Sequence, residues 1–175
     1  MRAILLVLMF LAADAQAANN PGAIKYGPLT REFEGLADPP SINGYCNFVD
    51  IVSGVRAIAK VLMTYQRDYG LNTIGKIIER YAPEGVDGNN TTEYVVFVSG
   101  RLGVVSDEVI NVFEYIYMRP VVDAIIRFEN VGPFPTDQET IRGIEAAGIE
   151  RNGVVLFYSH PYDRRATERP QGSLH

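Results

Sequence analysis

Cysteine, tryptophan and histidine are scarce in this 175-residue chain, which has one Cys, no Trp and two His. A single cysteine excludes an internal disulfide and a cysteine-rich zinc module, and two histidines argue against a metal site built from histidine. Basic residues are outnumbered, with 16 Lys and Arg against 21 Asp and Glu, and the net charge of -5 argues against nucleic acid as a partner. We therefore expect no metal, no cofactor and no nucleic acid.

Apolar residues make up 47% of the chain, which excludes disorder over most of its length. Part of that fraction lies in residues 1–17, where Arg2 precedes an apolar run and Ala15-Gln16-Ala17 follows it. This pattern is typical of a cleaved secretory signal peptide, and the run is short for a membrane span. We expect an exported protein, periplasmic or extracellular, without a stable membrane anchor after cleavage. An uncleaved anchor or a buried helix is the alternative.

Helical periodicity dominates the middle of the chain. Residues 19–50 are rich in Pro and Gly and read as an irregular segment, whereas residues 50–130 predict five helices with short joints. The predicted starts are Asp50 or Ser53, Thr73, Asn90, Ser106 and Pro120. The predicted fold class is therefore mainly α, with one domain over 18–132.

Residues 133–175 differ in character and form a predicted C-terminal appendage that can dock on this domain. Thr136 begins a capping-box pattern for a helix to about Ala147, and Val154 to Tyr158 read as a strand. The polar, arginine-rich end at 160–175 is expected to be mobile.

Glu129 is the acid whose position in the sequence is most unusual. It follows Ile125 and Ile126 at helical spacing, so it shares the apolar face of its helix. It also lies near the helix C-terminus, where the helix dipole disfavours a carboxylate by roughly 0.3–1 kcal/mol. Both effects raise the pKa of a carboxyl group, which is what a general acid needs near neutral pH. The alternative is a side chain that turns to water at a frayed helix end.

Asparagine and tyrosine are the other candidate binding residues. Asn19 and Asn20 stand at the predicted mature N-terminus, and Asn47 lies between Cys46 and Phe48. Side-chain amides both donate and accept hydrogen bonds, which suits sugar hydroxyls. Tyrosines in a groove with few lysines suit a neutral polymer such as a glycan. The alternatives are local turn capping for Asn19 and Asn20 and a surface position for Asn47.

Four segments together resemble a family of phage and bacterial proteins described as virion structural or muralytic proteins. The segments read NNPGAIKYG, FEGLADPPSINGYCNF, VRAIAKVLMTYQRDYGLNTIGKIIERYAP and AIIRFEN, and they span about 19–132. The resemblance implies degradation of peptidoglycan. The chain departs from the family pattern at Ala23, Lys25, Glu34 and Val131.

The same segments resemble lytic transglycosylases of the lysozyme superfamily in a different order, which implies a circular permutation. The resemblance places Glu129 at the catalytic position. It matches Gly44 to Phe48, which includes Tyr45, to a Gly-Leu-Met-Gln turn, with Asn47 at the position of the amide. Tyr81 matches a Tyr-Asn run, and Thr92-Glu93-Tyr94-Val95 loosely matches a Glu-Thr-x-x-Tyr-Val segment. A lysozyme-like helical domain is the implied fold.

The implied reaction is cleavage of the glycan strand between N-acetylmuramic acid and N-acetylglucosamine, with Glu129 as general acid and base. A hydrolase of this kind commonly uses a second carboxylate, for which Glu34 and Asp38 are the candidates. Neither stands out, so a lytic transglycosylase that uses one Glu is preferred over a muramidase. Two other functions stay open: an endopeptidase acting on the peptide crosslinks, and a non-catalytic glycan-binding or virion structural module.

Overall fold

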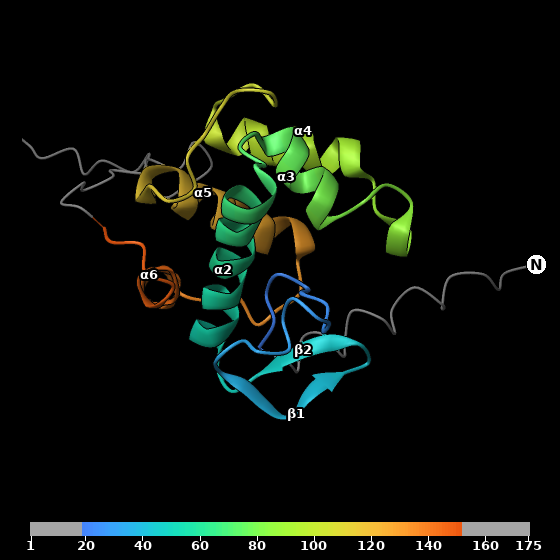
Figure 1. Cartoon of the computed structure of the whole chain (residues 1–175), viewed down its shortest axis with the longest axis vertical. Coiled ribbons are helices and arrows are strands. Elements are labelled where there is room, and N and C mark those ends of the chain that lie inside the picture. Colours follow the sequence, from blue (N-terminus) through green and yellow to red (C-terminus); the bar gives the residue numbers. More distant parts are fainter. Residues whose placement is uncertain (1–18, 152–175) are drawn as a thin grey trace, which may run out of the picture.

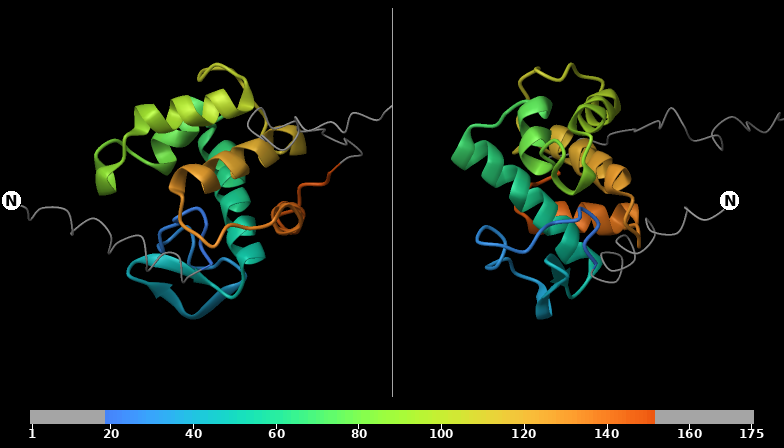
Figure 2. Two further views of the ribbon diagram at one scale, coloured as in Figure 1. Left: turned by 180° about the vertical axis from the view of Figure 1, so that it is seen from behind. Right: turned by 90° about the vertical axis from the view of Figure 1, so that its right-hand side faces the viewer.

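The computed structural model describes residues 19–151 and is mainly helical. A two-stranded antiparallel hairpin, β1 (Leu36–Ile42) and β2 (Tyr45–Phe48), lies at one end of the long helix α2 (Ile51–Tyr69) (Figure 1). Helices α3 (Ile74–Tyr81) and α4 (Thr91–Leu102) cover the other end, and a short 3-10 turn, η1 (Val86–Gly88), joins them. Helices α5 (Tyr115–Glu129) and α6 (Asp137–Ala146) complete the helical part. Figure 2 shows the hairpin and the 19–35 loop together below the helices.

The predicted helix starts are confirmed where a polar side chain caps the first turn. Asp50 accepts a hydrogen bond from the backbone N–H of Ser53 and begins α2, and Gly70 ends that helix in the left-handed conformation. Thr73 and Asn90 cap α3 and α4 in the same way. The complete capping box predicted at Thr136 is present at the start of α6.

The prediction of two helices over 106–117 and from Pro120 is wrong. Residues 103–114 form turns, in which Val109 makes an isolated bridge with Thr73. A single helix begins at Tyr115 and contains Pro120 in its interior. The apolar periodicity after Ser106 was therefore misleading: Val109 is exposed, and the backbone N–H of Ile110 donates to Asn72 instead of continuing a helix.

The irregular segment predicted over 19–50 contains the hairpin, whose two prolines hid the strand. Pro39 and Pro40 lie in β1, an edge strand in which a missing backbone N–H can face away from its partner. A register irregularity between Leu36 and Ser41 accommodates them. The predicted signal peptide at 1–17, the strand at 154–158 and the polar end at 160–175 lie outside the described residues.

Helix α6 packs against α2 and belongs to the same core as the other helices. Ile144 is fully buried in that core, and Gly143 lies so close to Val55 that a Cβ there would be 2.5 Å from the valine side chain. The predicted appendage therefore docks on the core through residues 137–149. Among residues 19–151, no helix combines the length and the apolar character needed to cross a membrane.

Candidate functional site

Glu129 is the last residue of α5, and its carboxyl group is half-buried. Asn130 follows in the left-handed conformation, with φ 50°, and ends the helix directly after the glutamate. The hydroxyl of Tyr94, on α4, donates a hydrogen bond of 2.9 Å to Oε1 of Glu129. Burial raises the pKa of Glu129 from 4.5 to about 7, and the hydrogen bond from Tyr94 opposes part of that rise. The carboxyl group is therefore able to hold or release a proton near neutral pH.

Aromatic rings hold the Tyr94 hydroxyl in place. The Tyr94 ring stacks on Phe128 with ring centroids 3.7 Å apart, and its edge meets Tyr81 at 6.4 Å. Burial and the nearby charge of Glu129 raise the pKa of both tyrosines well above the usual value of 10. Both hydroxyls therefore stay protonated, and Tyr94 remains a donor to the carboxylate.

The Asn19-Asn20-Pro21-Gly22 turn is hydrogen-bonded to Tyr81, which also contacts Tyr94. The hydroxyl of Tyr81 donates a hydrogen bond of 2.5 Å to the carbonyl of Gly22. Asn20 is buried, donates its amide to the carbonyls of Ile24 and Cys46, and accepts from the N–H of Ile24. This turn therefore links α3 to β2 next to the glutamate.

The predicted sugar-binding role of the first two asparagines finds no support in these contacts. The amide of Asn19 donates to the carbonyl of Phe48 at 3.1 Å, and both functions of the Asn20 amide are used by backbone groups. These hydrogen bonds satisfy buried backbone groups of the turn and of β2. These contacts hold the turn beside the site, and the binding of a sugar by Asn19 and Asn20 stays a prediction.

Tyr45 and Asn47 lie on the face of β2 opposite Cys46 and Phe48, which are buried. The amide of Asn47 donates a hydrogen bond of 2.8 Å to the carbonyl of Pro39 across the hairpin. That contact braces the hairpin, and no hydrogen bond in the described part of the chain joins either side chain to Glu129. Of the predicted binding residues, Tyr81 is the one that the structure brings beside the glutamate.

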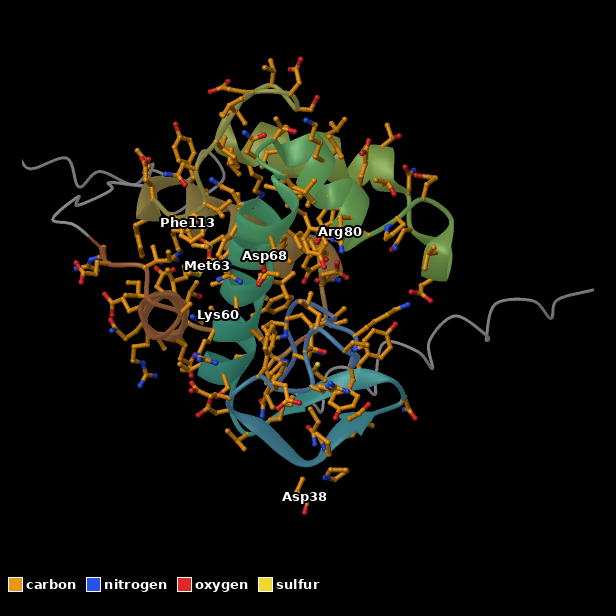
Figure 3. The ribbon with its side chains drawn as sticks, in the orientation of Figure 1. Asp38, Lys60, Met63, Asp68, Arg80 and Phe113 are labelled. Atoms are coloured by element: carbon orange, nitrogen blue, oxygen red, sulfur yellow. The ribbon has the colours of Figure 1, made fainter. Side chains whose placement is uncertain are left out.

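The two candidate second carboxylates are both engaged or directed elsewhere. Glu34 is exposed and forms an ion pair of 2.5 Å with Arg56, which also donates to the carbonyl of Ala146. Asp38 projects from the outer edge of the hairpin, away from the helices (Figure 3). Neither acid contributes to the shift in the pKa of Glu129. Within residues 19–151, no cluster of three metal-ligating side chains occurs.

Tyr94 is the site residue that reasoning from the sequence did not select. Its signal was the loose match of Thr92-Glu93-Tyr94-Val95 to a transglycosylase segment, together with its place on the buried face of α4. What the sequence did not show is that α4 packs against α5, which brings this hydroxyl to a glutamate 35 residues later.

Comparison with known proteins identifies a phage relative. No family model matches the chain. Protein P5 of Pseudoalteromonas phage PM2 is 34% identical over 135 residues, which cover 77% of this chain and 81% of P5. The aligned length amounts to most of both proteins, so the chain belongs to the same family as phage PM2 Protein P5.

Proposed function

We propose that this protein is a peptidoglycan-degrading enzyme that cleaves the glycan strand, with Glu129 as general acid and base. The observation that carries the proposal is a half-buried carboxyl group with a pKa of about 7, held by Tyr94 at the end of α5. A pKa near the working pH allows one group both to give and to take a proton. Membership of a family with a phage protein is compatible with a wall-degrading role.

The arrangement of elements supports the lysozyme-like fold that the sequence resemblance implies. The helices α3 and α4 lie at one end of α2, and the hairpin with the 19–35 loop lies at the other (Figure 1). The catalytic glutamate ends a buried helix between these two parts, as the proposal requires. The segments that match lytic transglycosylases occur here in a different order, with the glutamate segment last. We propose that a circular permutation accounts for this order.

The proposed reaction begins with protonated Glu129 beside the glycosidic oxygen. Its proton passes to that oxygen as the bond between the oxygen and C1 of muramic acid breaks, which releases the N-acetylglucosamine end. The resulting carboxylate then takes the proton of the muramic 6-hydroxyl as that oxygen bonds to C1, which gives an anhydro end. In a muramidase, a water takes the place of the 6-hydroxyl.

The transglycosylase form of the reaction is preferred because Glu129 has no carboxylate partner among residues 19–151. An intramolecular hydroxyl needs one base, whereas a hydrolase commonly uses a second carboxylate to stabilise the sugar cation or to activate water. The predicted leader at 1–17 would deliver the protein to the compartment that holds peptidoglycan.

The Glu129→Gln variant tests the assignment, because glutamine keeps the shape and cannot donate the proton. We expect the release of soluble fragments from purified sacculi to fall by at least about 100-fold. Glu145→Gln, an exposed change on α6, is the matched control and should keep full activity. Circular dichroism would verify that both variants fold. A folded Glu129→Gln protein that still clears sacculi would contradict the role of Glu129.

A further inference from the structure

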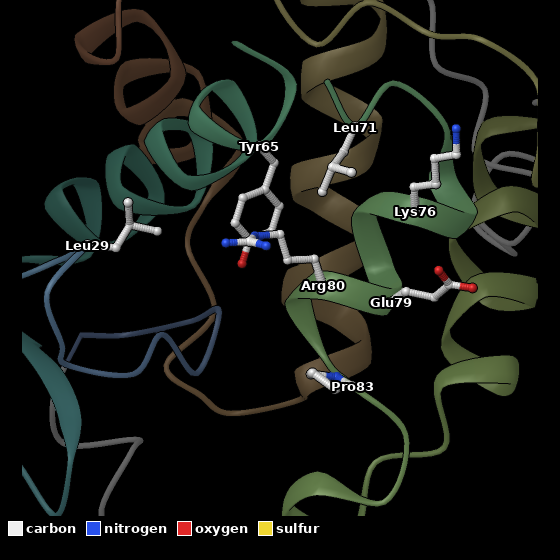
Figure 4. Close-up of a pocket in the computed structure, with 7 residues that line it drawn as sticks. All are labelled: Leu29, Tyr65, Leu71, Lys76, Glu79, Arg80 and Pro83. Carbon is white, nitrogen blue, oxygen red and sulfur yellow. The ribbon is translucent and has the colours of Figure 1, made fainter. Parts of the chain in front are cut away.

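An open groove of about 560 Å³ lies between the 19–35 loop and the helices α2 and α3 (Figure 4). Its walls are formed by apolar, aromatic and charged side chains, namely Leu29, Tyr65, Leu71, Lys76, Glu79, Arg80 and Pro83. Figure 4 shows Arg80 reaching across the groove toward Tyr65, while Glu79 extends from the other side of α3. The groove is therefore lined by two positive side chains, Lys76 and Arg80, and by one acid, Glu79.

Arg80 is held by aromatic rings. Its guanidinium carbon is 3.6 Å from the centre of the Tyr69 ring and 5.3 Å from the centre of the Tyr65 ring. Arg56 and Arg119, by contrast, are paired with carboxylates. Within residues 19–151, no ion pair joins Arg80 to an acid. A guanidinium stacked on a ring keeps its N–H edge available for a carboxylate, in the planar geometry that a lysine does not offer.

Tyr81 connects this groove with the glutamate. It follows Arg80 directly in α3 and its hydroxyl is bonded to Gly22. Burial is the main cause that raises the pKa of Tyr81, and the charge of Glu129 adds to that rise, so the glutamate lies near Tyr81. A polymer whose sugar bond lies at Glu129 would thus place a neighbouring substituent within reach of the groove.

We propose that the Arg80 groove binds a carboxylate of the peptide attached to muramic acid, so that the enzyme prefers glycan strands that carry their peptides. The inference rests on the proposed function, because it assumes that the glycan lies at Glu129. Each peptide carries free carboxylates that match the guanidinium of Arg80, and its alkyl side chains suit Leu29, Leu71 and Pro83. In a chain of net charge -5, an arginine without an acidic partner at this place selects for an anion.

Cleavage rates on two substrates test the preference. Wild-type protein should cleave peptide-bearing strands roughly 10-fold faster than strands from which an amidase has removed the peptides. Arg80→Gln should reduce this ratio to about one while leaving cleavage of bare strands unchanged, and Arg80→Lys should restore part of it. Arg142→Gln on α6, which removes the same charge away from the groove, should keep the wild-type ratio. An unchanged ratio in Arg80→Gln would overturn the inference and leave glycan cleavage standing.

Binding to the inactive Glu129→Gln variant tests the inference without cleavage. By isothermal titration calorimetry, the soluble disaccharide-peptide should bind roughly 10-fold more tightly than the disaccharide alone, and adding Arg80→Gln should remove the difference. Equal affinities for the two ligands would overturn the inference. If wild-type protein cleaves neither substrate, the proposed function fails, and this measurement still decides whether the groove binds the anionic peptide.

Discussion

The proposed reaction places two demands on Glu129, which would have to be buried enough to hold a proton near pH 7 and free enough to deliver it. The hydrogen bond from Tyr94 limits how far the pKa rises, because it stabilises the charged form. The ring of Phe128 fixes that hydroxyl by stacking on Tyr94. The neighbouring residues therefore set both the position and the pKa of the acid.

Removing the Tyr94 hydroxyl should shift the pH range of activity. In Tyr94→Phe the pKa of Glu129 rises, because the carboxylate loses a donor, so the acid stays protonated to higher pH. We expect the alkaline limb of the activity profile to move up by about 0.5 to 1 pH unit. Tyr117→Phe, which removes a hydroxyl elsewhere on α5, is the control. A downward shift, or none, would show that the hydrogen bond does not govern this titration.

The half-buried carboxyl group should also lower the stability of the protein as the pH rises toward neutrality. Because its pKa is raised from 4.5 to about 7, the folded protein holds a proton that the unfolded chain has lost, and the free energy of unfolding falls as pH rises between these values. Glu129→Gln has no carboxyl group at this position, so its free energy of unfolding does not fall for this reason. In urea titrations, the free energy of unfolding of Glu129→Gln relative to that of the wild type should increase by about 1–3 kcal/mol between about pH 4 and pH 8. A constant difference across that range would mean that Glu129 titrates normally.

Among the elements, α2 is the support to which the 19–22 turn, the hairpin and α6 are attached. Gly54 makes the approach of the turn possible, since a Cβ at this position would lie 2.0 Å from the backbone oxygen of Asn19. Gly143 does the same for α6 against Val55. Close packing of the 19–22 backbone on α2 thus positions Gly22, which accepts the hydrogen bond from Tyr81.

Substitution of Gly54 measures this packing. Gly54→Ala should lower the free energy of unfolding by roughly 1–3 kcal/mol, because the backbone at Asn19 has to move. Gly100→Ala in α4 is the matched control: a Cβ there meets nothing within 4 Å, so alanine should stabilise the helix by about 0.5–1 kcal/mol. Thermal unfolding of both variants gives the comparison. A Gly54→Ala protein as stable as the control would mean that the turn does not pack on α2 in this way.

The helices that could be predicted from the sequence are those whose first turn is fixed by nearby residues. Asp50, Thr73 and Thr136 cap helices through hydrogen bonds within three residues, so the sequence pattern was sufficient to place those starts. Pro120 was read as a first-turn residue, whereas the helix extends past it on the N-terminal side, where Tyr115 and Met118 are buried in the core. The hairpin depends on pairing between strands, which the prolines of β1 concealed.

For the molecule as a whole, the sequence indicated a mainly helical domain, and the structure shows how its distant parts meet at one place. Glu129 was predicted from its helical position and from the family resemblance, and burial in the structure raises its pKa in the expected direction. Tyr94 and Gly22 could not be placed from the sequence, because their roles depend on contacts between residues 35 and 59 positions apart. The role of Arg80 depends on the packing of α3 against the end of α2, where Tyr69 lies. Asn19 and Asn20 stabilise the fold of the same region.

The central claim is that this protein cuts the glycan strand through Glu129, and the products of digested sacculi test it most directly. Mass spectrometry of fragments released by the wild-type protein should show new glycan ends, of anhydro mass for a transglycosylase or reducing muramic ends for a muramidase. The folded Glu129→Gln variant should produce none. Free peptides without new glycan ends would instead identify an endopeptidase, and bound sacculi with no released fragments would identify a glycan-binding module. Either result would contradict the account.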